Sequence, residues 1–382
     1  MENPLKPADF KARTICILGM HRSGTSTVAR AINLLGVHLG EPAKMMPPSP
    51  DNQEGYWEHL DINDLQNRLM ARLEVGWDTV KPLPEGWLQS EIVRPFKDDL
   101  AQIVAANFSG HALWAWKEPQ TCLLLPLWRE TLEKAETKLS CLFVVRSPVD
   151  VAGSLMRRDA IPFDKALGIW FHNNIVALKD AAGLPIVFSS YDHLLAAWEP
   201  EMRRCAAALD LDWPKDEARY REAMNAFIKP DLRHNQSSLD QLQKLPYPVQ
   251  ELYQVLLEAS NQPSLYDHRS EATINRLARD FHAYTSFFPA NTQPPSRENL
   301  FEETVNRLSN DLDAYTSYLS SDINTPRREQ VMAWRARRGL PFQYFPLQSQ
   351  SPPPKLIHQL LGEKMCRSIC KRLAEACCWL RP

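Results

Sequence analysis

The residues best suited to chemistry lie in a loop at positions 19–26, which reads GMHRSGTS. The apolar run Thr14–Leu18 precedes this loop, and a helical pattern follows it. A strand, a glycine-bracketed loop and a helix N-terminus form an anion cradle, because backbone N–H groups converge there and the helix dipole adds positive charge. Arg22 supplies a cation, and Thr25 and Ser26 supply hydroxyls. The pattern predicts a site for a phosphate or sulfate group.

The loop differs from that of a nucleoside triphosphatase in two ways. Gly19 and Gly24 fit the G-x-x-x-x-G frame, but Thr25 stands where such a protein has lysine. Phosphoryl transfer also uses a strand-end Asp to hold Mg²⁺, and here the later apolar run ends in Arg146. A sulfuryl group carries less negative charge, so protein cations suffice for its transfer. We therefore expect no metal requirement, and an aberrant small-molecule kinase is the alternative enzyme.

Two further strand ends carry cations. Arg146 follows the run CLFVV, Pro148 then opens a helix, and Ser154 lies in the second helical turn. An arginine there can fork onto a terminal phosphate, and the serine can reach the same ligand. Lys117 ends another apolar run, LWAWK, and can stabilise charge that develops on a leaving group.

These motifs resemble the PAPS-dependent sulfotransferase superfamily, in particular its bacterial branch related to the tyrosylprotein sulfotransferases. The family loop commonly reads G-x-P-R-S-G-T-[ST], so His21 stands here in place of proline. The resemblance implies that PAPS is the donor and that Lys117 contacts its bridging oxygen. It assigns Arg146 and Ser154 to the 3′-phosphate. It assigns the 5′-phosphosulfate to Arg22, Ser23, Gly24, Thr25 and Ser26.

The base that deprotonates the acceptor is left open between two carboxylates. Glu41 lies close to where the tyrosylprotein branch carries its base, and Glu58 lies in the stretch NQEGYWE, which resembles a segment of the bacterial relatives. We favour Glu58 slightly, and His59 is a third candidate. Further along, Arg233 is a candidate phosphate contact.

The elements that must position these residues alternate between strands and helices. Apolar strand patterns occur at residues 14–18, 113–116, 139–145 and 185–189, with helical patterns between them. This order predicts an α/β fold of the P-loop type, in three layers with a central parallel sheet. Ligands of such sheets bind at the carboxyl ends of the strands. After an N-terminal tail (1–12), we place the sulfotransferase domain at residues 13–240.

The C-terminal third has a different character and forms a helical appendage. Residues 271–288 are repeated with similar sequence at 302–319, which defines a helical repeat region at 241–325. Residues 326–382 comprise a linker and a basic amphipathic helix. These helices are candidates for contact with a protein partner, a membrane surface or a second copy of the chain.

Bulk composition narrows the function. A formal net charge of -2 over 382 residues gives no reason to expect binding to nucleic acid. No apolar run reaches the length of a signal peptide core or a membrane span, so we expect a cytoplasmic protein with reduced thiols. The predicted activity is transfer of a sulfuryl group from PAPS to a hydroxyl, most commonly that of a carbohydrate. The non-enzymatic alternative is an adaptor that retains the fold.

Overall fold

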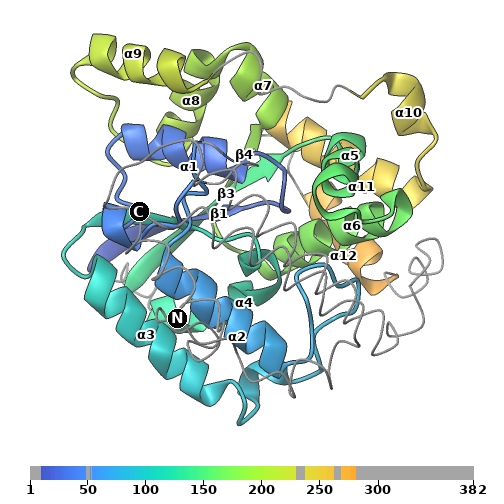
Figure 1. Ribbon diagram of the computed structural model, residues 1–382, viewed down its shortest axis with the longest axis horizontal. Helices are drawn as coiled ribbons and strands as arrows, with labels where there is room; N and C mark the ends of the chain where they lie inside the picture. Colours follow the sequence, from blue (N-terminus) through green and yellow to red (C-terminus); the bar gives the residue numbers. More distant parts are fainter. Residues whose placement is uncertain (1–9, 49–51, 53, 229–236, 262–267, 281–382) are drawn as a thin grey trace, which may run out of the picture. The chain divides into compact units, whose positions relative to one another are not determined.

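The computed structural model describes residues 10–48, 52, 54–228, 237–261 and 268–280. All the described residues belong to one compact unit (Figure 1). Among the helices of this described part, none is both long enough and apolar enough to cross a membrane.

A four-stranded parallel sheet lies at the centre of this unit. Its strands are β1 (Ala12–Leu18), β2 (Leu113–Lys117), β3 (Thr137–Val145) and β4 (Ile186–Ser190), in the order β2-β1-β3-β4. Every adjacent pair is parallel. Each strand overlaps one of the four predicted runs. The predicted α/β class with a central parallel sheet is therefore confirmed.

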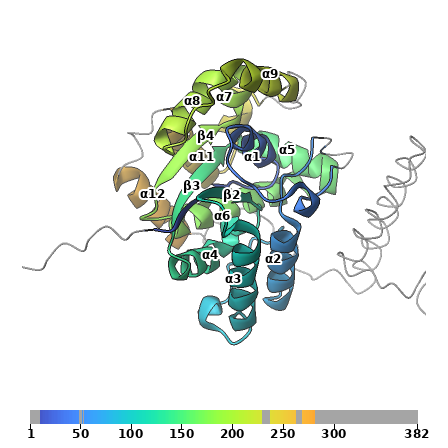
Figure 2. The same cartoon turned by 90° about the vertical axis from the view of Figure 1, so that its left-hand side faces the viewer.

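Helices cover both faces of the sheet, as Figure 2 shows. One face packs against α1 (Thr25–Leu34), α7 (Tyr191–Ala196), α8 (Trp198–Ala208) and α9 (Glu217–Phe227). The opposite face packs against α2 (Leu60–Arg72), α3 (Arg94–Phe108), α4 (Thr121–Lys134), α5 (Pro148–Asp159), α6 (Phe163–Asp180), α11 (Tyr247–Asn261) and α12 (His268–Arg279). Three short helices, η1 (Pro42–Lys44), η2 (Trp87–Gln89) and α10 (Leu239–Gln243), lie in connections.

The strands supply side chains to two apolar cores because successive residues of a strand point to opposite faces. In β1, Ile15 and Ile17 belong to the core beneath α1, whereas Cys16 and Leu18 belong to the other core. The strands are buried on both sides, so they read as continuous apolar runs rather than as alternating patterns. This burial is why the sequence identifies them.

Two helices beyond residue 240 belong to the same core. Leu252 and Leu256 of α11 and Ile274 and Leu277 of α12 are buried, and both helices pack against α6. The compact unit therefore includes these two helices, which lie beyond residue 240, the predicted end of the sulfotransferase domain. The second repeat copy, the predicted basic C-terminal helix and Arg233 lie outside the described residues.

Candidate active site

The carboxyl ends of three neighbouring strands carry the predicted motifs. Lys117 is the last residue of β2 and lies beside Ile17 of β1, and Leu18 of β1 lies beside Phe143 of β3. The loop at residue 19 and Arg146 therefore start from adjacent strands. The strand order also reverses here, because the chain runs from β1 outward to β2 and then returns to β3 on the other side. Open parallel sheets bind ligands at such a switch point.

The glycine-bracketed loop places the N-terminus of α1 at this edge. Gly24, the N-cap, has φ 89°, and a Cβ added there would lie 2.1 Å from the ring of Tyr191. Glycine is therefore required both by the left-handed backbone and by the close approach of the ring. Within the described residues, no side chain caps α1 and no acidic residue lies in its first turn. The positive end of the helix dipole and its first N–H groups are thus available to an anion.

The two predicted anion sites adjoin each other. The Nε atom of Arg22 donates a hydrogen bond to the hydroxyl of Ser154 over 3.0 Å. A guanidinium nitrogen of Arg146 donates to the backbone carbonyl of Arg22 over 2.8 Å, and its guanidinium lies 4.5 Å from the centre of the Tyr191 ring. The Nε atom of Arg146 is buried and has no hydrogen-bond partner among the described residues. The guanidinium of Arg146 is thus held against the backbone of Arg22 and, within the described part of the chain, keeps a free donor in its Nε atom.

The segment at residues 52–58 folds over the start of α1. The Ser26 hydroxyl donates to the carbonyl of Tyr56 over 3.1 Å, and the Asn52 amide donates to the carbonyl of Gly55 over 2.8 Å. The guanidinium of Arg30 stacks on the ring of Trp57 at 4.5 Å. The segment therefore lies beside the glycine-bracketed loop and the start of α1.

This segment delivers Glu58 to the end of β2. The Glu58 carboxylate forms an ion pair with the Lys117 ammonium, and their side chains are only 9% and 1% exposed. The neighbouring Glu118 is also buried and accepts a hydrogen bond from the backbone N–H of Gln120 over 2.8 Å. Burial, and then the charge of Glu58, raises the pKa of Glu118 well above its usual range. The end of β2 thus carries a buried cation whose charge is balanced by a neighbouring carboxylate.

The other two candidate bases lie away from Lys117. Glu41 is exposed and immediately precedes η1, where its carboxylate lies near His38 and His111. The buried His59 packs against Phe108, with ring centres 5.6 Å apart. Of the two carboxylates that the sequence leaves open, the structure brings only Glu58 to the lysine. Arg233 lies outside the described residues.

Sequence reasoning missed one residue of the site. The His21 ring lies 4.8 Å from the ring of Trp77, and its Nε2 atom is buried without a hydrogen-bond partner among the described residues. Burial, and then the positive charges of Arg158, Lys117 and Arg22, holds the pKa of His21 well below its usual range. The ring is therefore neutral at neutral pH. The available signal was the histidine that replaces the proline of the family loop.

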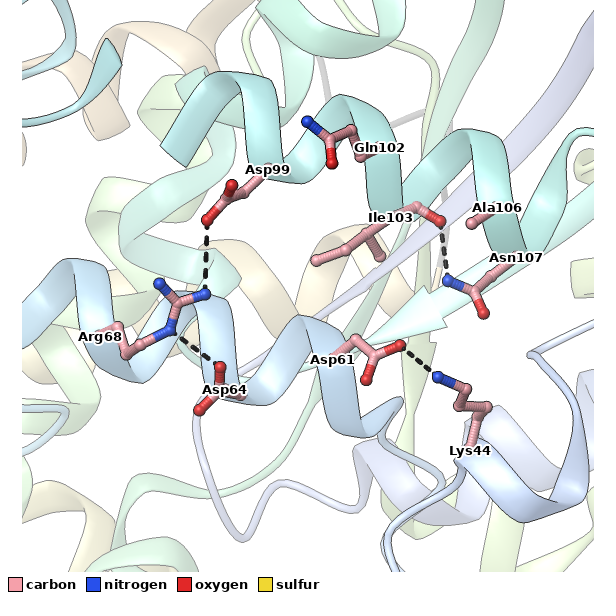
Figure 3. Close-up of a pocket in the computed structure, with 9 residues that line it drawn as sticks. All are labelled: Lys44, Asp61, Asp64, Arg68, Asp99, Gln102, Ile103, Ala106 and Asn107. Carbon is pink, nitrogen blue, oxygen red and sulfur yellow. Dashed lines mark hydrogen bonds and ion pairs between the residues drawn. The ribbon is translucent and has the colours of Figure 1, made fainter. Parts of the chain in front are cut away.

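A cavity of about 400 Å³ lies between α2 and α3 (Figure 3). Its charged groups pair with each other: Lys44 with Asp61, and Arg68 with both Asp64 and Asp99. No residue predicted to bind the donor lines this cavity. Its cations are already matched by carboxylates, so it does not resemble an anion site.

Comparison with known proteins gives matches among solved structures. The sequence matches no protein-family model and no curated protein sequence. The chain is similar to the sulfotransferase domain of the Synechococcus PCC 7002 olefin synthase, with 19% identity, a TM-score of 0.36, and coverage of 74% of this chain and 98% of that one. It is similar to the sulfotransferase domain of the curacin biosynthetic pathway, with 18% identity, a TM-score of 0.35, and coverage of 66% and 98%. It is also similar to the sulfotransferase STF9 of Mycobacterium avium, with 14% identity, a TM-score of 0.32, and coverage of 61% and 70%.

Proposed function

We propose that this chain is a sulfotransferase that moves the sulfuryl group of PAPS to a hydroxyl acceptor, most commonly that of a carbohydrate. One observation carries the proposal. Arg22, Arg146 and the buried Lys117 converge on neighbouring strand ends. β3 is followed by Arg146, where a magnesium-dependent phosphoryl transferase would carry Asp.

The residues of the loop and of α5 fit a donor with two anionic groups. The N-terminus of α1, with Arg22, Thr25 and Ser26, would hold the 5′-phosphosulfate. Arg146 and Ser154 would hold the 3′-phosphate, and the unpartnered Nε atom of Arg146 supplies a donor for it. A bidentate guanidinium is well suited to a terminal phosphate.

Lys117 and Glu58 would perform the transfer. Glu58 accepts the proton of the acceptor hydroxyl while that oxygen forms its bond to sulfur. The bond between sulfur and the bridging oxygen breaks, and the leaving phosphate keeps the electron pair. Lys117 donates a hydrogen bond to the leaving oxygen and so stabilises its charge. In the free protein the two residues neutralise each other, so both must exchange partners when the substrates bind.

Binding and transfer assays together test this function. We expect calorimetry to show tight binding of PAPS and of its desulfated product, with no dependence on Mg²⁺. Transfer of labelled sulfate from PAPS should then be measured against glycans, lipids and tyrosine peptides, with glycans expected to accept it. Binding of ATP with Mg²⁺ in preference to PAPS would favour the kinase, and tight binding of PAPS without transfer to any acceptor would favour the adaptor. Either result contradicts the proposal.

A further inference from the structure

Three possible metal ligands meet at the edge of the sheet beside β2. His38 follows α1 and bridges to β2, where its carbonyl accepts a hydrogen bond from the N–H of Ala115 over 2.8 Å. His111 lies in the turn between α3 and β2, and Glu41 immediately precedes η1. One ligand atom from each of the three side chains lies within 4.8 Å of the other two. The fold therefore gathers two imidazoles and a carboxylate from three separate segments.

The surroundings of His38 suit a side chain that binds a metal ion. Its Nε2 atom is buried and has no hydrogen-bond partner among the described residues. Its ring also has a hydrogen-bond interaction with the backbone of Asn107 at the end of α3. Histidines that bind metals commonly use one ring nitrogen for the ion while the other donates to a backbone carbonyl. A polar atom buried without a partner is otherwise unfavourable.

The two imidazole rings are already in contact. The rings of His38 and His111 are stacked, with centres 3.5 Å apart and planes 8° apart. The ring of Phe108 meets the ring of His38 edge-on at 5.9 Å, which supports its position. In a tetrahedral site with bonds of about 2.1 Å, ligand atoms lie roughly 3.4 Å apart. His111 and the exposed Glu41 must therefore turn toward His38, and the stack must open.

We propose that His38, His111 and Glu41 bind a zinc ion, with water as the fourth ligand. Two histidines and a carboxylate form a donor set typical of zinc, whereas Mg²⁺ and Ca²⁺ prefer oxygen ligands alone. This site is distinct from the donor site and does not depend on the proposed transferase function. It also accounts for Glu41, which the transfer chemistry does not use.

Zinc at this position would fix the segment that leads to Glu58. η1 follows Glu41 directly, and Met46 donates a backbone hydrogen bond over 2.8 Å to the carbonyl of Glu58. Met45 forms an antiparallel bridge with His59 in the same place. The ion would therefore join the end of α3, the edge of β2 and the start of this segment, and it should stabilise the folded chain.

Zinc titration of the full-length chain, without an affinity tag, tests the proposal. We expect a site whose zinc affinity falls by more than about 100-fold in His111→Ala and in Glu41→Gln, because loss of a ligand should exceed the 10- to 100-fold effect of an outer partner. His193→Ala, which removes an exposed histidine on α7, should bind zinc as the unchanged chain does. Zinc should raise the melting temperature of the unchanged chain and of His193→Ala only, and Mg²⁺ should raise neither.

Cobalt distinguishes this site from binding at cysteines, since the sequence also holds Cys366, Cys370 and Cys377. Co²⁺ bound by nitrogen and oxygen gives visible absorption without a thiolate charge-transfer band, and we expect that spectrum to disappear in His111→Ala. His38→Ala should lose it too, provided that circular dichroism shows the variant to be folded. The proposal is wrong if the zinc affinity of His111→Ala and Glu41→Gln equals that of the unchanged chain. It is also wrong if the cobalt spectrum shows thiolate ligands alone.

Discussion

The two halves of the candidate active site handle charge differently. Beyond the ends of β1 and β3, the Arg146 guanidinium donates to the backbone carbonyl of Arg22, and the Nε atom of Arg146 has no partner among the described residues. At the end of β2, Lys117 is more deeply buried and is already paired with Glu58. The first half is thus prepared to receive an anion. The second half must break an internal pair before it acts, which suits a group needed only during the reaction.

The largest effect should come from removing the cation of the second half. Lys117→Ala leaves the Glu58 carboxylate buried without its partner, and breaking a buried pair in this way costs about 3–5 kcal/mol of stability. Turnover with PAPS should fall by roughly 10²- to 10³-fold, as when a donor to a developing oxyanion is removed. Urea unfolding and single-turnover sulfate transfer measure the two effects.

A double variant separates the two roles of Lys117. Lys117→Met with Glu58→Gln removes both charges, so stability should recover while turnover stays low. Lys138→Ala, which removes an exposed lysine of β3, should change neither quantity. If Lys117→Ala unfolded at the same urea concentration as the unchanged chain, the ion pair of Lys117 and Glu58 would not be buried in solution. The two halves of the site would then not differ in how they handle charge.

Sequence patterns identify the strand ends of both halves, but not the contact between Lys117 and Glu58. The apolar runs before residues 19, 117 and 146 identify buried strands, and parallel strands necessarily bring their carboxyl ends to one edge. The pairing of Glu58 with Lys117 has no such local signal. It depends on the backbone path of the segment at residues 52–58, which includes Trp57 with φ 56°. No periodic pattern of apolar residues in the sequence predicts that path.

The neutral state of His21 could not be predicted from the sequence either. It depends on burial and on the cations Arg158 and Lys117, which come from α5 and β2. Sequence alone could identify His21 as an unusual loop residue, but not its surroundings. Long-range electrostatics is thus the part of the site that required the structure.

The second-largest effect concerns the first half of the site, at the ends of β1 and β3. Arg146→Ala removes charge-assisted hydrogen bonds, which are worth about 1.5–3 kcal/mol, so the dissociation constant of PAPS should rise by about 10- to 100-fold. Turnover at saturating donor should change little, because Lys117 and Glu58 remain. Calorimetric titration with the desulfated product measures the change without an acceptor.

Arg203→Ala is the control for this substitution, because Arg203 is an arginine of α8 that pairs with Glu199 near the surface. It should bind the donor as the unchanged chain does. An unchanged donor affinity in Arg146→Ala would show that the end of β3 does not hold the 3′-phosphate.

The smallest effect should come from Glu118. It tests whether this buried carboxyl group stays protonated beside the ion pair of Glu58 and Lys117. Because its pKa is raised above the ordinary value of 4.5, Glu118 keeps its proton in the folded chain at pH values where the unfolded chain has lost it. Its contribution to stability is thus fully present below pH 4.5 and is lost as the pH rises toward the folded pKa, with a slope of at most about 1.4 kcal/mol per pH unit.

Glu118→Gln cannot ionise, so its unfolding free energy should lack this decline, and Glu222→Gln on the exposed face of α9 should retain it. Urea unfolding of the three proteins between pH 4.5 and 8 gives the comparison. Parallel curves for all three would mean that Glu118 is ionised beside Glu58, and that the end of β2 is not neutral but carries an excess negative charge.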